Sequence, residues 1–129
     1  MTPGERLARN ILLFIAVATM ATGLMQIVSP SFMLGIMHGE ATPTSTHFFA
    51  IIGMFMVLFG GVMWQALRTR PEQPIPLFWA ALQKLGAFAA VAIAVQRGLL
   101  SPLAWAVALF DLFTGVLALW YWNRVRVDS

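Results

Sequence analysis

The chain has 129 residues, of which 60% are hydrophobic and 10% charged, with no cysteine and a formal net charge of +3. A soluble domain carries about a quarter charged residues and one this small could not bury so much apolar surface, so a soluble globular protein is excluded. The missing cysteine excludes disulfides, cysteine-ligated zinc and iron–sulfur clusters, and the positive residues stand at the ends of apolar segments rather than in a patch for nucleic acid.

Four apolar stretches have the length of about twenty residues that a membrane-spanning helix needs. The predicted spans are 10–28, 48–67, 76–96 and 102–122, all within one domain of residues 1–129. Pro30 ends the first span, and the cluster Thr44–Thr46 offers an N-cap for the second. Pro76 stands in the first turn of the third, and Ser101 with Pro102 begins the fourth. Because the link between them is short, the last two spans form an antiparallel hairpin.

The arginines are divided unevenly between the two sides of the predicted bundle. The side of the two termini and the second loop carries Arg6, Arg9, Arg68, Arg70, Arg124 and Arg126. The other side carries Arg97. By the positive-inside rule, this distribution predicts a multi-pass protein of the inner membrane with both termini cytoplasmic. The predicted fold is an all-α integral-membrane four-helix bundle with up-down-up-down topology.

Small and polar residues recur at helical spacing along each span. These stripes are Ala16, Thr19, Gly23 and Gln26; Ala50, Gly53, Gly60 or Gly61, and Trp64; Ala80, Gln83, Ala87, Ala90 and Ala94; and Ala104, Ala108, Asp111, Gly115 and Ala118. In lipid, helices associate through close packing of small residues and through polar contacts. Because the polar residues share the small-residue stripes, we expect one compact bundle with a polar seam inside it.

Two ionisable residues lie well inside the spans, Lys84 in the third and Asp111 in the fourth. Folding the hairpin about its turn places them within two residues of the same depth, or roughly 3 Å, which a lysine side chain can cover. One interpretation is a structural ion pair that holds the two spans in register, with Gln83 completing its hydrogen bonds. The other is a proton-titrating or substrate-binding site, because charges inside a membrane are often functional. The sequence leaves both interpretations open.

A second polar group, His38, Glu40 and His47, lies on the outer side of the predicted bundle near Met33 and Met37. A soft set of ligands made of Met33, Met37, His38 and His47 could bind copper(I). Methionine is also ordinary apolar filling in a bundle, and His47 suits the membrane interface ahead of the second span. We therefore predict no metal and no cofactor, with a quinone or a lipid as the alternative ligand.

The segment "GLMQIVSPSF", residues 23–32, places a glycine, a polar residue, a proline and an aromatic residue in succession. It resembles the end of the first helix in DoxX-like bacterial membrane proteins, and the chain's size and four-span plan are also similar to that family. Gln26 stands where those proteins have a lysine. The resemblance implies an accessory membrane subunit or a neighbour of a quinone-linked oxidoreductase.

The sequence contains no nucleophile elbow, phosphate-binding loop, zinc-protease motif or dinucleotide fingerprint. We therefore favour a non-catalytic accessory or anchoring subunit, in contact with the lipid bilayer and with copies of itself or other membrane subunits. One alternative is a small oligomeric proton-coupled transporter or channel that uses Asp111 and Lys84. A further alternative is a quinone- or lipid-handling membrane protein.

Overall fold

A computed structural model describes residues 1–128 of the chain, and these are helical with short connections. The helices are α1 (Pro3–Val28), α2 (Pro30–Ile36), α3 (Pro43–Arg68), α4 (Pro74–Gln96) and α5 (Ala104–Asp128). All except the short α2 are long and apolar enough to cross a membrane. The predicted class is confirmed: the chain is an all-α membrane protein whose four long helices pack into a bundle.

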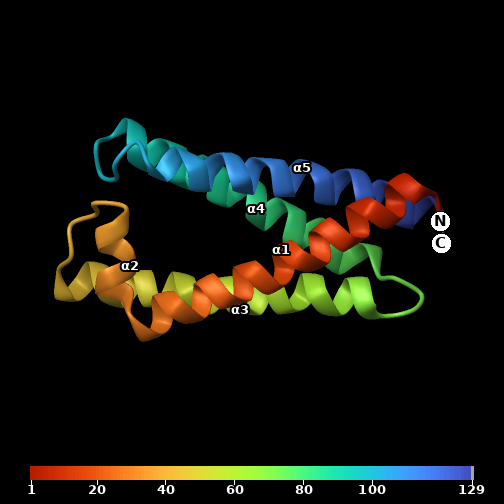
Figure 1. The fold of residues 1–129 in the computed structure, drawn as a ribbon, viewed down its shortest axis with the longest axis horizontal. Coiled ribbons are helices and arrows are strands. Elements are labelled where there is room, and N and C mark those ends of the chain that lie inside the picture. Colours follow the sequence, from red (N-terminus) through yellow and green to blue (C-terminus); the bar gives the residue numbers. More distant parts are fainter. Residues whose placement is uncertain (129) are drawn as a thin grey trace.

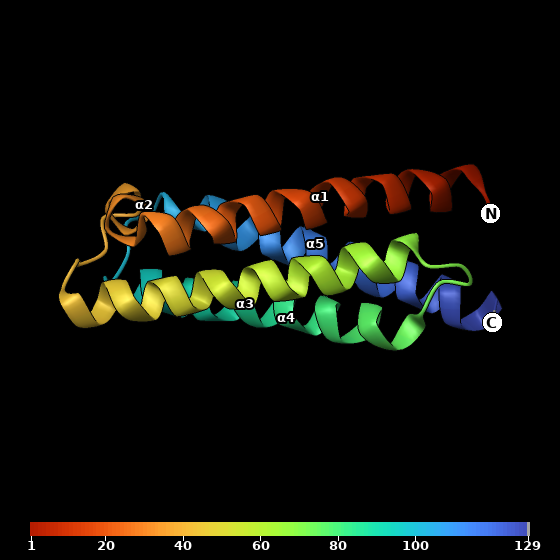
Figure 2. The ribbon, with the colours of Figure 1, turned by 90° about the horizontal axis from the view of Figure 1, so that it is seen from below.

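The four long helices run antiparallel along one axis (Figures 1 and 2). Both termini and the α3–α4 loop lie at one end of the bundle, which we call the terminal end. Helix α2 and the turn between α4 and α5 lie at the opposite end, which we call the α2 end. At the α2 end, the backbone N–H of Ser101, in the α4–α5 turn, donates to Met37 O just after α2 and so joins these two segments.

Prolines and capping residues set where the helices begin and end. A proline occupies the first turn of α1, α2, α3 and α4, where its missing N–H costs no helical hydrogen bond. The N-cap of α3 is Thr42, which forms a capping box with Ser45, so the predicted cap at Thr44–Thr46 is displaced by the proline at position 43. Helix α4 ends at Gln96 with Arg97 as its C-cap, and Gly98 follows with φ +73°, a left-handed conformation that glycine adopts without strain.

The helices associate as two pairs, α1 with α3 and α4 with α5, and each pair packs more extensively than any contact between the pairs. Glycines allow the close approach within the first pair. A Cβ built on Gly23 would lie 2.5 Å from Gly53 O, and one built on Gly53 would lie 2.6 Å from Gly23 O. Gly60, rather than Gly61, continues this contact against Ala16 O. Backbone therefore meets backbone along the α1–α3 contact.

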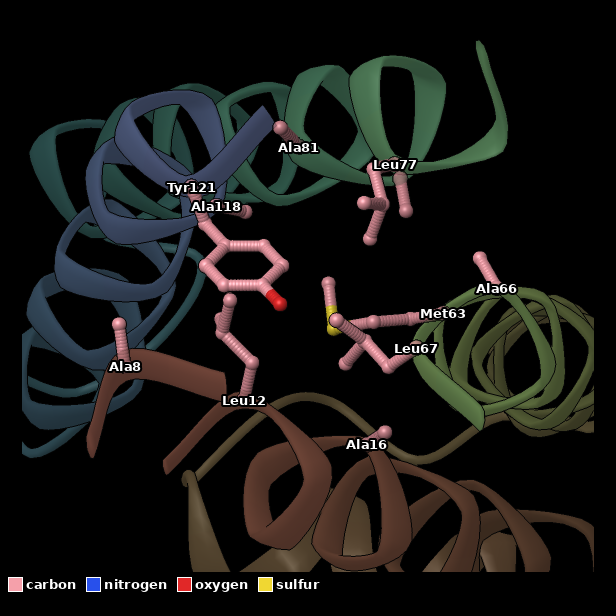
Figure 3. Close-up of a cluster of buried hydrophobic side chains, with 11 residues drawn as sticks. Ala8, Leu12, Ala16, Met63, Ala66, Leu67, Leu77, Ala81, Ala118 and Tyr121 are labelled. Carbon is pink, nitrogen blue, oxygen red and sulfur yellow. The ribbon is translucent and has the colours of Figure 1, made fainter. Parts of the chain in front are cut away.

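The hydrophobic core lies toward the terminal end, where both pairs come together. Its buried members are Ala8, Leu12, Ala16, Met63, Ala66, Leu67, Leu77, Ala80, Ala81, Ala118 and Tyr121. Figure 3 shows Tyr121 of α5, Leu12 of α1 and Met63 of α3 directed toward one another. All of these residues except Ala16, which stands at the middle of α1, belong to the half of their helix nearer the terminal end, so this half holds the two pairs together.

The predicted stripes agree with the observed burial in α1 and α5 and fail in parts of α3 and α4. All the predicted residues of α1 and α5 are buried. In α3, Trp64 is 41% exposed and does not belong to the interior. In α4, burial is confined to Leu77, Ala80, Ala81 and Lys84, whereas Ala90 of the predicted stripe faces outward. The α4 prediction fails because the two helix pairs separate away from the terminal end (Figure 1), whereas Trp64 lies near that end on a face of α3 turned away from the interior.

Candidate functional site

Lys84, near the middle of α4, is held by residues of two other helices. Its Nζ lies 3.5 Å from Asp111 Oδ1 of α5, and it donates a hydrogen bond of 2.7 Å to Thr19 Oγ1 of α1. The exposed fractions of the Lys84 and Asp111 side chains are 6% and 12%. The charge therefore joins α4 both to its own partner helix and to the other helix pair.

The surroundings of Lys84 explain how an ammonium group is tolerated at this depth. Phe110 lies with its ring centroid 5.8 Å from Nζ, near the limit at which a cation is attracted to an aromatic face. Asp111 supplies the opposite charge and Thr19 a neutral acceptor. Removing one member of such a buried pair leaves the other charge uncompensated, at a cost of about 3–5 kcal/mol, whereas replacing both by apolar residues is often neutral.

Gln83 does not join this ion pair. Its Oε1 atom is buried and has no hydrogen-bond partner within residues 1–128. Successive residues of a helix point about 100° apart, because 3.6 residues make one turn. Lys84 turned toward Asp111 therefore directs Gln83 elsewhere, and the predicted hydrogen-bonding role of Gln83 is not seen. Thr19 is a partner of Lys84 that the sequence did not predict.

A second buried charged group lies at the terminal end, around Glu72 of the α3–α4 loop. The Glu72 carboxylate accepts hydrogen bonds from Tyr121 Oη of α5 and from Arg70 Nη1, and lies 3.8 Å from Arg9 Nε of α1. Arg9 also donates to Leu67 O, with distances of 3.2 Å from Nε and 3.0 Å from Nη2. The Glu72 side chain is only 6% exposed. This cluster fastens α1, α3, α5 and the loop to one another.

The sequence did not single out Glu72, because it stands in a short loop of polar residues and prolines. Two of its partners are distant in the sequence: Arg9 lies 63 residues toward the N-terminus (72 − 9), and Tyr121 lies 49 residues toward the C-terminus. One signal was present: Glu72 is the lone carboxylate of the α3–α4 loop, which also holds Arg70 and directly follows Arg68. A single acid among arginines at a membrane boundary is a candidate for burial in an ion-pair network.

Gln26, the polar residue of the segment "GLMQIVSPSF", has a contact within its own helix pair. It is 5% exposed, and its Nε2 donates to Phe49 O of α3 at 3.2 Å. The bond reaches a carbonyl in the second turn of α3, close to the contact between Gly23 and Gly53. In this chain the position therefore joins α1 to α3.

His38, Glu40 and His47 lie at the α2 end but do not assemble into a metal site. In the part of the chain that the structure describes, no three His, Asp or Glu side chains are placed to hold a metal ion. His38 follows α2 with φ 56°, Glu40 O accepts from Ser45 Oγ, and the His47 ring contacts Phe48. These contacts are local to each residue. The copper(I) set with Met33 and Met37 stays a prediction from residue type alone.

Comparison of the chain with protein families, with curated proteins and with solved structures found no match.

Proposed function

We propose that this is a small multi-pass protein of the inner membrane that acts as a non-catalytic accessory or anchoring subunit of a membrane complex. The observation that supports this most is how its internal charges are used. Lys84 joins α4 to α1 and α5, and Glu72 joins the α3–α4 loop to α1 and α5. Both clusters connect one helix pair to the other. This favours a structural role in stabilising the bundle over a role as a reactive site.

The exterior supports the same proposal. Large apolar side chains face outward along all four long helices; examples are Phe14, Phe55, Ile93 and Phe113, with exposed fractions of 74%, 50%, 48% and 53%. Such a surface suits lipid tails or the helices of another membrane subunit. The connections are short, so the helices themselves provide most of the surface available for contact with a partner.

The arginine distribution supports an orientation with the terminal end in the cytoplasm. Arg6, Arg9, Arg68, Arg70, Arg124 and Arg126 belong to this end. Lys and Arg accumulate on the cytoplasmic side of membrane proteins. The similarity of residues 23–32 to DoxX-like proteins adds an accessory subunit as the expected role.

Crosslinking in intact membranes followed by native mass spectrometry of the gently extracted protein tests the proposal. We expect a stable assembly with a second membrane protein that survives extraction. A chain that is monomeric in membranes and captures no partner would contradict the accessory role. A prenyl lipid retained at one molecule per chain would instead favour quinone or lipid handling.

A proton-coupled transporter is the second candidate, and one distance favours it. The separation of 3.5 Å between Lys84 Nζ and Asp111 Oδ1 exceeds the 2.7–2.9 Å of a tight charged hydrogen bond, so the carboxylate is loosely held. A loosely held carboxylate at this depth could exchange a proton during transport.

Substituting Lys84 and Asp111, each alone and both together, distinguishes the accessory subunit from the transporter. If the Lys84–Asp111 ion pair is structural, Lys84→Met or Asp111→Leu alone lowers the free energy of unfolding by about 3–5 kcal/mol, and the double variant recovers most of the loss. Unfolding in mixed micelles measures these changes. If Asp111→Asn abolishes proton-coupled flux in vesicles while the fold stays as stable as the wild type, the transporter is the better assignment.

A further inference from the structure

A pocket of about 280 Å³, lined in part by charged side chains, opens at the terminal end, apart from the Lys84 site. Its lining includes Glu5, Arg70, Glu72, Tyr121, Arg124 and Val125. These residues come from the start of α1, the α3–α4 loop and the last turns of α5, which Figure 1 shows together at one end of the bundle. The pocket is therefore built from three segments that are distant in the sequence.

Glu5 contributes a carboxylate with no partner. The residue is only 9% exposed, and no hydrogen bond or ion pair to its side chain is found in the described part of the chain. Its position in the first turn of α1 lets the helix dipole stabilise the negative charge in part. Glu72, the other carboxylate of the pocket, already binds Tyr121 and Arg70. Glu5 is thus the acceptor that remains available to a ligand.

The same pocket presents two guanidinium groups. Arg70 binds Glu72 through Nη1, while its side chain is 58% exposed. Because a guanidinium carries five N–H donors, most of those on Arg70 remain available. Arg124 lies over the Trp120 ring, with 5.1 Å from Cζ to the ring centroid, which leaves the edge of its guanidinium free to donate. The pocket therefore offers one unpaired anion beside two hydrogen-bonding cations.

The depth of the pocket decides which ligand can reach it. Glu5 precedes the apolar run of α1, and Arg124 follows the aromatic residues Trp120 and Trp122 of α5. Tryptophans at the end of a span mark the level of the lipid headgroups. A headgroup that carries both charges on one short chain would match the pocket.

We propose that this pocket binds the headgroup of an ethanolamine phospholipid. The ammonium donates to the Glu5 carboxylate, and the phosphate accepts from Arg70 and Arg124. A choline headgroup has no N–H to donate, and a glycerol headgroup has only neutral hydroxyl donors, so neither forms a charged hydrogen bond with Glu5. The inference requires only that the chain lies in a membrane, and it does not depend on the accessory role.

Native mass spectrometry of the protein titrated with ethanolamine, choline and glycerol phospholipids of identical acyl chains tests the proposal. We expect the ethanolamine lipid to bind about tenfold more tightly than the other two, which corresponds to one charged hydrogen bond. Glu5→Gln should reduce its affinity to that of the choline lipid and leave the choline lipid unchanged. Arg124→Gln should weaken all three lipids, because all three carry the phosphate.

The matched control is Glu40→Gln, which removes an exposed carboxylate at the α2 end and should leave the preference intact. Thermal unfolding of each variant without added lipid shows whether it is folded. Equal affinity for the three lipids, or an ethanolamine preference that persists in a folded Glu5→Gln variant, would overturn the proposal. Soluble phosphoethanolamine competing as well as the lipid would also overturn it, because the site would then not be a lipid site.

Discussion

The close crossing of α1 and α3 makes Gly53→Ala the most informative single substitution. A Cβ at position 53 would lie 2.6 Å from Gly23 O and 2.7 Å from the Cβ of Gln26. Neither atom can rotate away, since one belongs to the backbone and the other is fixed to it. A carbon in contact with a carbonyl oxygen normally lies about 3.3 Å away, so the helices must separate locally by roughly 0.7 Å.

The cost of Gly53→Ala follows from three contributions. Overpacking of this kind destabilises by about 1–3 kcal/mol, toward the upper end here because the clash is with backbone. The hydrogen bond from Gln26 to Phe49 O is already 3.2 Å long, and separation of the helices would weaken it at a cost of about 1 kcal/mol. The higher helix propensity of alanine returns about 1 kcal/mol. The expected net loss is about 2–3 kcal/mol of unfolding free energy.

Unfolding of the purified protein in mixed micelles of increasing dodecyl sulfate fraction, followed by tryptophan fluorescence, measures this loss. Gly86→Ala is the matched control, because a Cβ there meets nothing within 4 Å. It should leave stability unchanged or raise it by up to about 1 kcal/mol. If Gly53→Ala proves as stable as Gly86→Ala, the close contact of the two backbones does not hold the first helix pair together, and the reasoning fails.

Two further predictions use the same measurement. Tyr121→Phe removes a hydroxyl that donates to the nearly buried Glu72 carboxylate, and should cost about 1–3 kcal/mol; a change below about 0.5 kcal/mol would mean that Arg9 and Arg70 satisfy Glu72 alone. Thr42→Ala removes the N-cap of α3 and should cost about 0.5–2 kcal/mol. Thr44→Ala, two residues further on, should stay within about 0.5 kcal/mol, and the reverse order would show that the cap is misassigned.

Local patterns in the sequence predicted the helices and much of the interior of α5. A helix needs only a long apolar run and a few end signals, all of which are adjacent in the chain. The stripe from Ala104 to Ala118 is buried because residues three and four apart share one face of a helix. The similar depth of Lys84 and Asp111 in the bundle is also predictable. Only a short turn separates their helices, so counting residues along each helix from that turn places the two side chains.

Contacts between the two helix pairs could not be predicted from local sequence patterns. Thr19 is 65 residues from Lys84, and Tyr121 is 49 residues from Glu72. Nothing in the spacing of one helix fixes its rotation against a helix from the other pair. The outward position of Trp64 has the same origin, because it depends on which face of α3 meets α4.

The sequence by itself determined that the chain has four helices long and apolar enough to cross a membrane and that a lysine and an aspartate lie at similar depths. These follow from the cost of placing polar backbone and charges in hydrocarbon, which acts on each segment separately. The tertiary structure alone decided that Thr19 binds Lys84, that Glu72 is buried among Arg9, Arg70 and Tyr121, and that Glu5 is left without a partner. Those outcomes depend on how two helix pairs are rotated and tilted against each other, a property of the assembled bundle.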